Sequence, residues 1–155
     1  MAHPEENLKS LGLALPAVAT PVASFVNSRL VGDMLYISGQ GPRKPDGTLH
    51  LGKLGAGLSA EQGVEHARLA GLGLLAVAKQ ALGDLDRVEC VVKLLGMVNS
   101  APDFVEHPKV INGCSDLLVS VFGAERGGHA RSAVGFASLP GGMSVEIEAI
   151  FKVKS

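Results

Sequence analysis

The stretch HARSAVGFASLPGGMSVEIEAIFKV, residues His129 to Val153, decides the predicted fold. Two runs of alternating side chains flank Leu139-Pro140-Gly141-Gly142, which is typical of a β-hairpin with a glycine turn. A two-residue turn would put two sets of side chains on opposite faces of the hairpin. The first face would carry Arg131, Ala133, Gly135, Ala137, Glu146, Glu148, Ile150 and Lys152. The second would carry Val134, Phe136, Val145, Ile147, Ala149, Phe151 and Val153. The second set is apolar and is the predicted core face.

Arg131 is the first candidate binding residue, because the small side chains predicted beside it leave room for a ligand. A guanidinium with free space beside it suits a planar carboxylate. The alternative is a surface ion pair between Arg131 and Glu146 or Glu148. The hairpin alone favours the ion pair, since structural ion pairs outnumber binding sites.

The composition indicates one globular domain without a polyanionic partner. The chain has 155 residues, 46% of them hydrophobic and only 4% aromatic, with a net charge of −1. We therefore expect no binding to nucleic acid or to an anionic membrane. Cys90 and Cys114 stand in apolar runs without paired or metal-ligand spacing, which predicts two small buried side chains in a reducing compartment.

The apolar segment Leu11–Ala23 has the hydrophobicity of a signal-peptide core but not its flanks. Glu5 and Glu6 precede it where basic residues belong, and Pro16 and Pro21 interrupt it. No run reaches the length of a membrane-spanning helix. We expect a soluble cytoplasmic protein with no membrane partner.

The remaining elements are read from caps, turns and periodicity. Ser59 and Gln62 fit a capping box that opens a long helix, and Pro108 suits the first position of a second one. The predicted elements are a short helix from Pro4 to about Gly12, a hairpin of Val22–Val31 with Met34–Ser38, a helix from Ser59 to Leu82, a strand from Arg87 to Asn99 and a helix from Pro108 to Phe122 ending at Gly123.

The strand at Arg87–Asn99 is apolar on both sides, with Val88, Cys90, Val92 and Leu94 on one and Val91, Leu95 and Met97 on the other. Such a strand must be covered on both faces. The order ββ-α-β-α-ββ predicts an α+β fold in which two long helices cover one face of a mixed sheet. Another subunit would have to cover the second face, so the pattern predicts a homo-oligomer.

Two blocks carry a family resemblance. Gly32-Asp33-Met34-Leu35-Tyr36-Ile37-Ser38-Gly39-Gln40 resembles the signature GNLLYxSGQ of the RidA/YjgF family of reactive intermediate deaminases, also called L-PSP endoribonucleases. Ala130-Arg131-Ser132-Ala133-Val134-Gly135, followed by Leu139-Pro140 and Val145–Ile150, resembles its C-terminal signature. The resemblance covers residues 22–153 of a single domain 1–155, with residues 1–21 as an N-terminal extension.

The resemblance implies a chorismate-mutase-like fold that forms a trimer with ligand sites between subunits. It implies cofactor-independent hydrolysis of enamines and imines, such as 2-aminoacrylate, to a keto acid and ammonia. Arg131 would hold the substrate carboxylate and Glu146 would lie near the attacking water. Further lining residues implied by the match are Ser38, Gly39 and Asn112.

Two of the implied site positions depart from the family pattern. Phe25 stands where most members have a tyrosine, and Ala133 where many have a cysteine. The segments 43–58 and 100–115 also look longer than usual. These differences indicate a divergent subgroup and leave the substrate open.

Two other functions remain as alternatives: a non-catalytic protein that binds a small carboxylate, and an endoribonuclease. A slightly acidic chain with one tyrosine and no basic stripe argues against the nuclease. No metal site is expected, because His3, His50, His66, His107 and His129 lack ligand-like spacing. His129, close to Arg131, could rim the binding site or be an ordinary loop residue.

Overall fold

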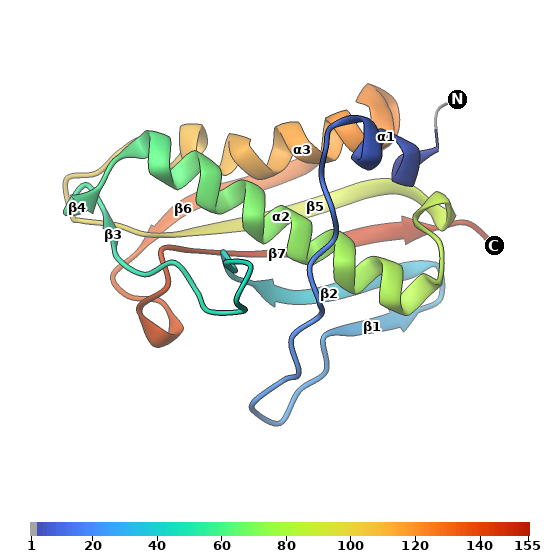
Figure 1. The fold of residues 1–155 in the computed structure, drawn as a ribbon, viewed down its shortest axis with the longest axis horizontal. Helices are drawn as coiled ribbons and strands as arrows, with labels where there is room; N and C mark the ends of the chain where they lie inside the picture. The colour runs from blue at the N-terminus through green and yellow to red at the C-terminus, as the bar shows by residue number, and fades with distance from the viewer. Residues whose placement is uncertain (1–2) are drawn as a thin grey trace.

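The computed structural model describes residues 3–155 as a five-stranded mixed sheet with helices on one side (Figure 1). The strand order β1-β2-β7-β5-β6 makes β1 and β6 the two edges. The elements are α1 (Pro4–Ser10), β1 (Ser28–Val31), β2 (Met34–Gln40), β3 (Lys53–Leu54), β4 (Gly57–Leu58), α2 (Ala60–Leu82), β5 (Val88–Asn99), α3 (His107–Gly127), β6 (Ala130–Phe136) and β7 (Val145–Val153). The predicted order of elements and the α+β class are confirmed.

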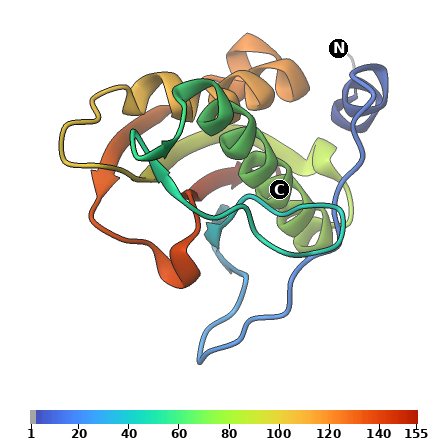
Figure 2. The same ribbon diagram turned by 60° about the vertical axis from the view of Figure 1, so that its left-hand side comes forward.

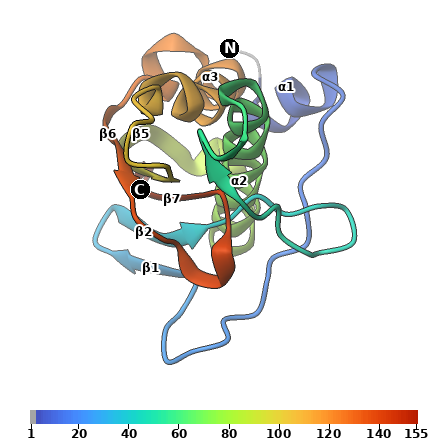
Figure 3. The ribbon, with the colours of Figure 1, turned by 90° about the vertical axis from the view of Figure 1, so that its left-hand side faces the viewer.

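The long helices α2 and α3 lie on the same face of the sheet (Figure 3). Ser59 caps α2 and forms the predicted capping box with Gln62, and Gly83 ends the helix. α3 continues past the predicted end at Gly123, where a backbone φ of 85° kinks the helix. The core between helices and sheet includes Leu35, Leu74, Leu94, Ile111, Leu118, Ile147 and Phe151.

The N-terminal segment packs over the helices. Asn7 Nδ2 on α1 donates to the Val121 carbonyl of α3 at 2.8 Å, and Leu8 is buried. The chain then crosses the outer side of α2 and reaches β1 through an irregular loop (Figures 1 and 2). The predicted strand start at Val22 is wrong, because β1 begins at Ser28. Within residues 3–155, no helix is both long and apolar enough to cross a membrane.

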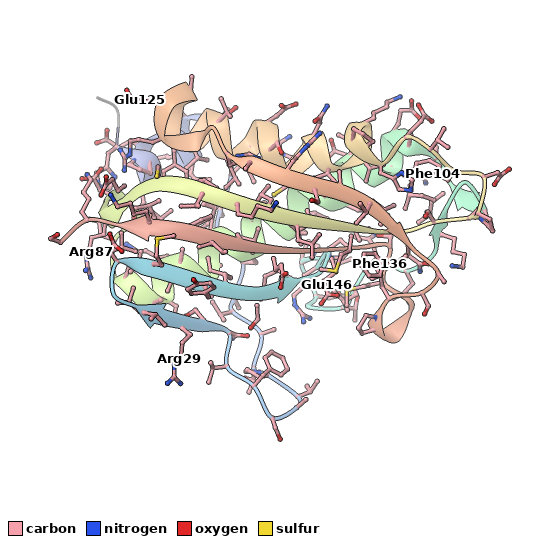
Figure 4. The ribbon with its side chains drawn as sticks, turned by 180° about the vertical axis from the view of Figure 1, so that it is seen from behind. Arg29, Arg87, Phe104, Glu125, Phe136 and Glu146 are labelled. Carbon is pink, nitrogen blue, oxygen red and sulfur yellow. The ribbon has the colours of Figure 1, made fainter. Side chains whose placement is uncertain are left out.

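Strand β5 lies between β7 and β6, and its alternation is interrupted. Two register shifts near its start change which side chains face the helices. Val91 and Leu94 are both buried under the helices, whereas simple alternation predicts opposite faces for them. Leu95 and Met97 point to the other face, which no element of residues 3–155 covers (Figure 4).

The last two strands do not form the predicted hairpin. β6 pairs in parallel with β5, and β7 pairs antiparallel with β5, so β5 separates them. The connection after Phe136 passes the end of β5 and contains a 3₁₀ turn at Pro140–Gly142. The glycine pair is compatible with a hairpin, but both strands instead pair with a strand distant in sequence.

The long loop between β2 and α2 is fastened to the sheet by Lys53. Its Nζ donates to Asn99 Oδ1 at 2.7 Å and to the Ala137 carbonyl. Asn99 Nδ2 in turn donates to the Met143 carbonyl at 3.1 Å. The loop therefore ties the end of β5 to the connection between β6 and β7.

Gly113 sets the distance between α2 and α3. A Cβ at this position would collide with the backbone carbonyl of Val64 on α2. We expect Gly113→Ala to lower the free energy of unfolding by roughly 1–3 kcal/mol, because the helices must separate. Urea unfolding at fixed protein concentration measures the change. Ser120→Ala, at an exposed position of α3, should stay within about 0.5 kcal/mol of wild type. Equal stability of the two variants would contradict this reading.

Candidate functional site

The predicted site residues form two groups at different places in one chain. The first lies where edge strand β6 meets α3 and comprises Arg131, Ala133 and Asn112. The second comprises Ser38, Gly39 and Glu146 on β2 and β7, with Phe25 in the loop before β1. Since β1 and β6 are opposite edges of the sheet, Phe25 and Arg131 belong to opposite sides of the molecule.

The predicted common face for Arg131 and Glu146 is wrong. Arg131 pairs with Leu94, which is buried under the helices, so its side chain lies on the helix side. Glu146 pairs with Met97 on the uncovered face. Because β5 lies between β6 and β7, the register assumed for a hairpin does not exist. Within residues 3–155, the alternative ion pair of Arg131 with Glu146 or Glu148 is therefore not formed.

Arg131 is instead bound to α3. Its Nη1 donates to Ser115 Oγ at 3.0 Å, and its Nη2 donates to the Pro108 carbonyl at 3.2 Å. Asn112 lies between these two residues on the same side of the helix and is exposed. A guanidinium has five N–H donors, so these two bonds leave three for a ligand.

Ser115 and His129 extend this arrangement. Ser115 Oγ lies 2.9 Å from His129 Nε2, and His129 Nδ1 lies 2.7 Å from the Gly127 carbonyl. His129 lies in the loop between α3 and β6 and reaches Arg131 only through Ser115; whether it rims a binding site stays a prediction. Ser115 was missed in the sequence, although its spacing of three from Asn112 puts both on one side of a helix.

Ala133 and Gly135 continue the helix-facing side of β6 beyond Arg131. A Cβ at Gly135 would lie 2.5 Å from both His107 Nε2 and Ser100 Oγ. The side chains of His107 and Ser100 therefore cover Gly135, at the end of β6 away from Arg131.

Glu146 on the uncovered face packs against the backbone of Gly39. A Cβ at Gly39 would lie 2.5 Å from Glu146 Oε1, so only glycine fits there with the present carboxylate position. Burial raises the pKa of Glu146, and the nearby charge of Glu148 raises it further. A carboxyl group with a raised pKa is suited to proton transfer near neutral pH. Figure 4 shows Glu146 on this face.

A cavity of about 500 Å³ lies beside this group on the uncovered face. Its lining includes apolar side chains, two cations and one carboxylate: Tyr36, Leu95, Ile150, Arg29, Lys93 and Glu148. Ser38 lines it as well, and Ser38 Oγ donates to the Val26 carbonyl at 2.7 Å. The hydroxyl proton of Ser38 is thus used structurally, while its oxygen can still accept a hydrogen bond.

A third polar cluster lies under the loop between β2 and α2. The buried His66 ring has its Nδ1 2.8 Å from Ser144 Oγ and stacks on His50 with ring centroids 4.3 Å apart. Burial lowers the pKa of His66 to about 4, with smaller contributions from the charges of His50 and Lys44. The ring is therefore neutral in the folded protein at neutral pH.

We expect this buried histidine to make the protein acid-sensitive. The pKa of His66 is near 6.5 in the unfolded chain and about 4 in the folded protein. Between these two pH values the unfolded chain binds a proton that the folded protein does not bind. The free energy of unfolding should therefore fall by about 2 kcal/mol as the pH is lowered from 7 to 5. His66→Gln keeps a hydrogen-bonding group but does not titrate there, and should flatten this dependence in urea unfolding at fixed protein concentration. An unchanged slope would show that other groups cause it.

Among residues 3–155, no three His, Cys, Asp or Glu side chains are arranged to hold a metal ion. Cys114 is fully buried next to the Arg131 region; burial raises the pKa of its thiol to about 12, against the opposing charge of Arg131. Cys114 is thus a core side chain and not a nucleophile.

Comparison with known proteins identifies relatives along almost the whole chain. Residues 5–144 match the family model described as "YjgF/chorismate_mutase-like, putative endoribonuclease". Protein TCP17 of Trypanosoma cruzi is 46% identical over 96% of this chain and 93% of its own. The structure of Atu1372 from Agrobacterium tumefaciens, a protein of unknown function, is 42% identical, covers 97% and 92% of the two chains and has a TM-score of 0.90. A "putative endoribonuclease" from Shewanella oneidensis is 35% identical, covers 98% and 100%, and has a TM-score of 0.94.

Proposed function

Because the chain belongs to the RidA/YjgF family, we propose that it hydrolyses reactive enamines and imines. The substrates are of the 2-aminoacrylate and 2-imino acid class, and the products are a keto acid and ammonia. No cofactor takes part. The proposal depends mainly on Arg131, a partly exposed guanidinium that is anchored by two hydrogen bonds and keeps three free donors.

Arg131 binds the substrate carboxylate in this proposal. The two oxygens of a carboxylate match two parallel N–H groups of a guanidinium. The exposed amide of Asn112, on the same side of α3 as Pro108 and Ser115, offers the substrate a further hydrogen-bonding group. Binding through the carboxylate fixes the imine carbon at a constant distance from Arg131.

A second copy of the chain completes the site. Arg131 and Glu146 lie on opposite faces of the sheet, so one chain cannot bring both to a small substrate. The uncovered face also exposes large apolar side chains, including Tyr36, Val134 and Phe136; Figure 4 shows Phe136 on it. Such a face favours association. We propose a homotrimer, in which Arg131 of one copy meets Glu146, Gly39, Ser38 and Phe25 of the next. Light scattering that gives a monomer at micromolar concentration would contradict this assembly.

The reaction needs one positioned water and one proton acceptor. The water oxygen attacks the imine carbon, and the electron pair of the C=N bond moves to nitrogen. Glu146 accepts the proton of the water and delivers it to the nitrogen. Glu146 then takes the proton of the new hydroxyl group and gives it to the same nitrogen, so that the C–N bond breaks and ammonia leaves as the C=O bond of the keto acid forms. Holding the carboxylate and the water in one geometry contributes to the rate by proximity.

An assay with freshly generated substrate tests the proposal. An amino-acid oxidase or dehydratase produces 2-imino acids or 2-aminoacrylate, and keto-acid release is followed with and without this protein. We expect faster release with the protein present. If the wild-type protein binds pyruvate but leaves the rate of release unchanged, the site is a carboxylate-binding site without catalysis.

Endoribonuclease activity is the second candidate, favoured by the description of the matching family model and of the Shewanella protein. The net charge of −1 argues against it. RNA cleavage that co-purifies with the protein and persists in Arg131→Ala would support the nuclease and contradict the proposed imine site.

A further inference from the structure

Three side chains on the helix side of β6 form a continuous hydrogen-bonded row: Arg131, Ser115 and His129. The row ends on the backbone carbonyl of Gly127. All three side chains are partly buried, and they come from α3, the loop after it and β6. The proposed reaction uses only Arg131, so the other two need an explanation.

The direction of each hydrogen bond follows from the end of the row. The Gly127 carbonyl can only accept, so His129 Nδ1 carries the proton. In the neutral ring Nε2 is then an acceptor, and Ser115 donates its hydroxyl proton to it. The lone pairs of Ser115 Oγ are left for the Arg131 Nη1–H group. For the neutral imidazole, this one carbonyl thus determines the role of every atom in the row.

We propose that Ser115 and His129 are positioning residues that fix the Arg131 guanidinium for carboxylate binding, an inference that rests on the proposed function. Arginine has a long side chain whose immobilisation costs conformational entropy. Here Ser115 Oγ and the Pro108 carbonyl hold one N–H group of each terminal nitrogen. The guanidinium plane is therefore oriented before the ligand arrives. His129 acts through Ser115, because it orients the hydroxyl so that an oxygen lone pair, and not the proton, faces the arginine.

Removal of the serine hydroxyl tests the inference. We expect Ser115→Ala to weaken the binding of pyruvate, measured by calorimetry, by roughly five- to tenfold, the effect of one hydrogen bond. Ser115→Thr retains a hydroxyl and should stay within about twofold of wild type, which a purely packing role of this position would not predict. His129→Leu should weaken binding, whereas His129→Gln should restore part of it. Ser120→Ala, an exposed serine on the same helix, is the matched control.

A spectroscopic measurement gives a second, ligand-independent result. The Arg131 Nε–H resonance, assigned by its loss in Arg131→Lys, should be observable in wild type and broadened in Ser115→Ala. Unchanged pyruvate affinity and an unchanged resonance in Ser115→Ala would overturn this inference alone. A wild-type protein that does not bind pyruvate would overturn both this inference and the proposed function.

Discussion

Replacing Arg131 with alanine is expected to lower kcat/KM for imine hydrolysis by roughly 10- to 150-fold, the effect of a lost charge-assisted hydrogen bond. Most of the change should be in KM, because the guanidinium binds the carboxylate in both ground state and transition state. The side chain is partly exposed and makes two hydrogen bonds to α3. Folding and assembly should therefore change little. Steady-state kinetics with a generated 2-imino acid, together with thermal unfolding, measure both effects.

Two further variants make the Arg131 result specific. Arg131→Lys keeps the positive charge but loses the planar fork, so its kcat/KM should lie between those of wild type and alanine. Arg87→Ala removes an exposed arginine just before β5 (Figure 4), at the opposite end of the molecule from Glu146, and should retain wild-type kinetics. If Arg131→Ala remains fully active, or if it unfolds, Arg131 is a structural residue and the assignment of the site fails.

Local signals in the sequence predict the helices well but the strand pairing less well. The capping box at Ser59 and the glycine at position 83 are interactions within a few residues, and the structure has both. The predicted final hairpin is wrong because β6 and β7 each pair with β5, a contact between distant segments that alternation does not encode. The same limit applies within β5, where register shifts alter the face of Val91.

The candidate site, like the fold, could be predicted from the sequence only in part: its residues could be identified, but not how they lie relative to one another. The family signatures identify Arg131 and Glu146 as residues of interest, but their relative position depends on which strands pair. The structure places them on opposite faces of the sheet, which corrects the common face predicted from the hairpin and is consistent with the site between subunits that the resemblance implies. Ser115 was missed because a serine on a helix is ordinarily read as a solvent-facing residue. Only the packing of α3 on β6 brings it to Arg131.

Replacing Glu146 with glutamine is expected to lower kcat by roughly 10²- to 10⁴-fold, the usual contribution of a general base. Glutamine keeps the size of the side chain, so the contact with Gly39 should be preserved and the fold unchanged. KM should change little, because Arg131 still binds the carboxylate. Single-turnover measurements with a generated 2-imino acid separate the chemical step from binding.

The pH dependence distinguishes Glu146 from its neighbour. Burial, and then the charge of Glu148, raise the pKa of Glu146 above the usual 4.5. A base must be ionised, so kcat should fall as the pH drops through this raised pKa. Glu148→Gln removes the second cause only. For Glu148→Gln, the fall of kcat at acid pH should therefore occur at lower pH than in wild type, but at higher pH than the usual pKa of a glutamate would give. The maximal kcat should be retained. If Glu148→Gln abolishes activity while Glu146→Gln remains active, Glu148 is the base, and the cavity that it lines is where the water is activated.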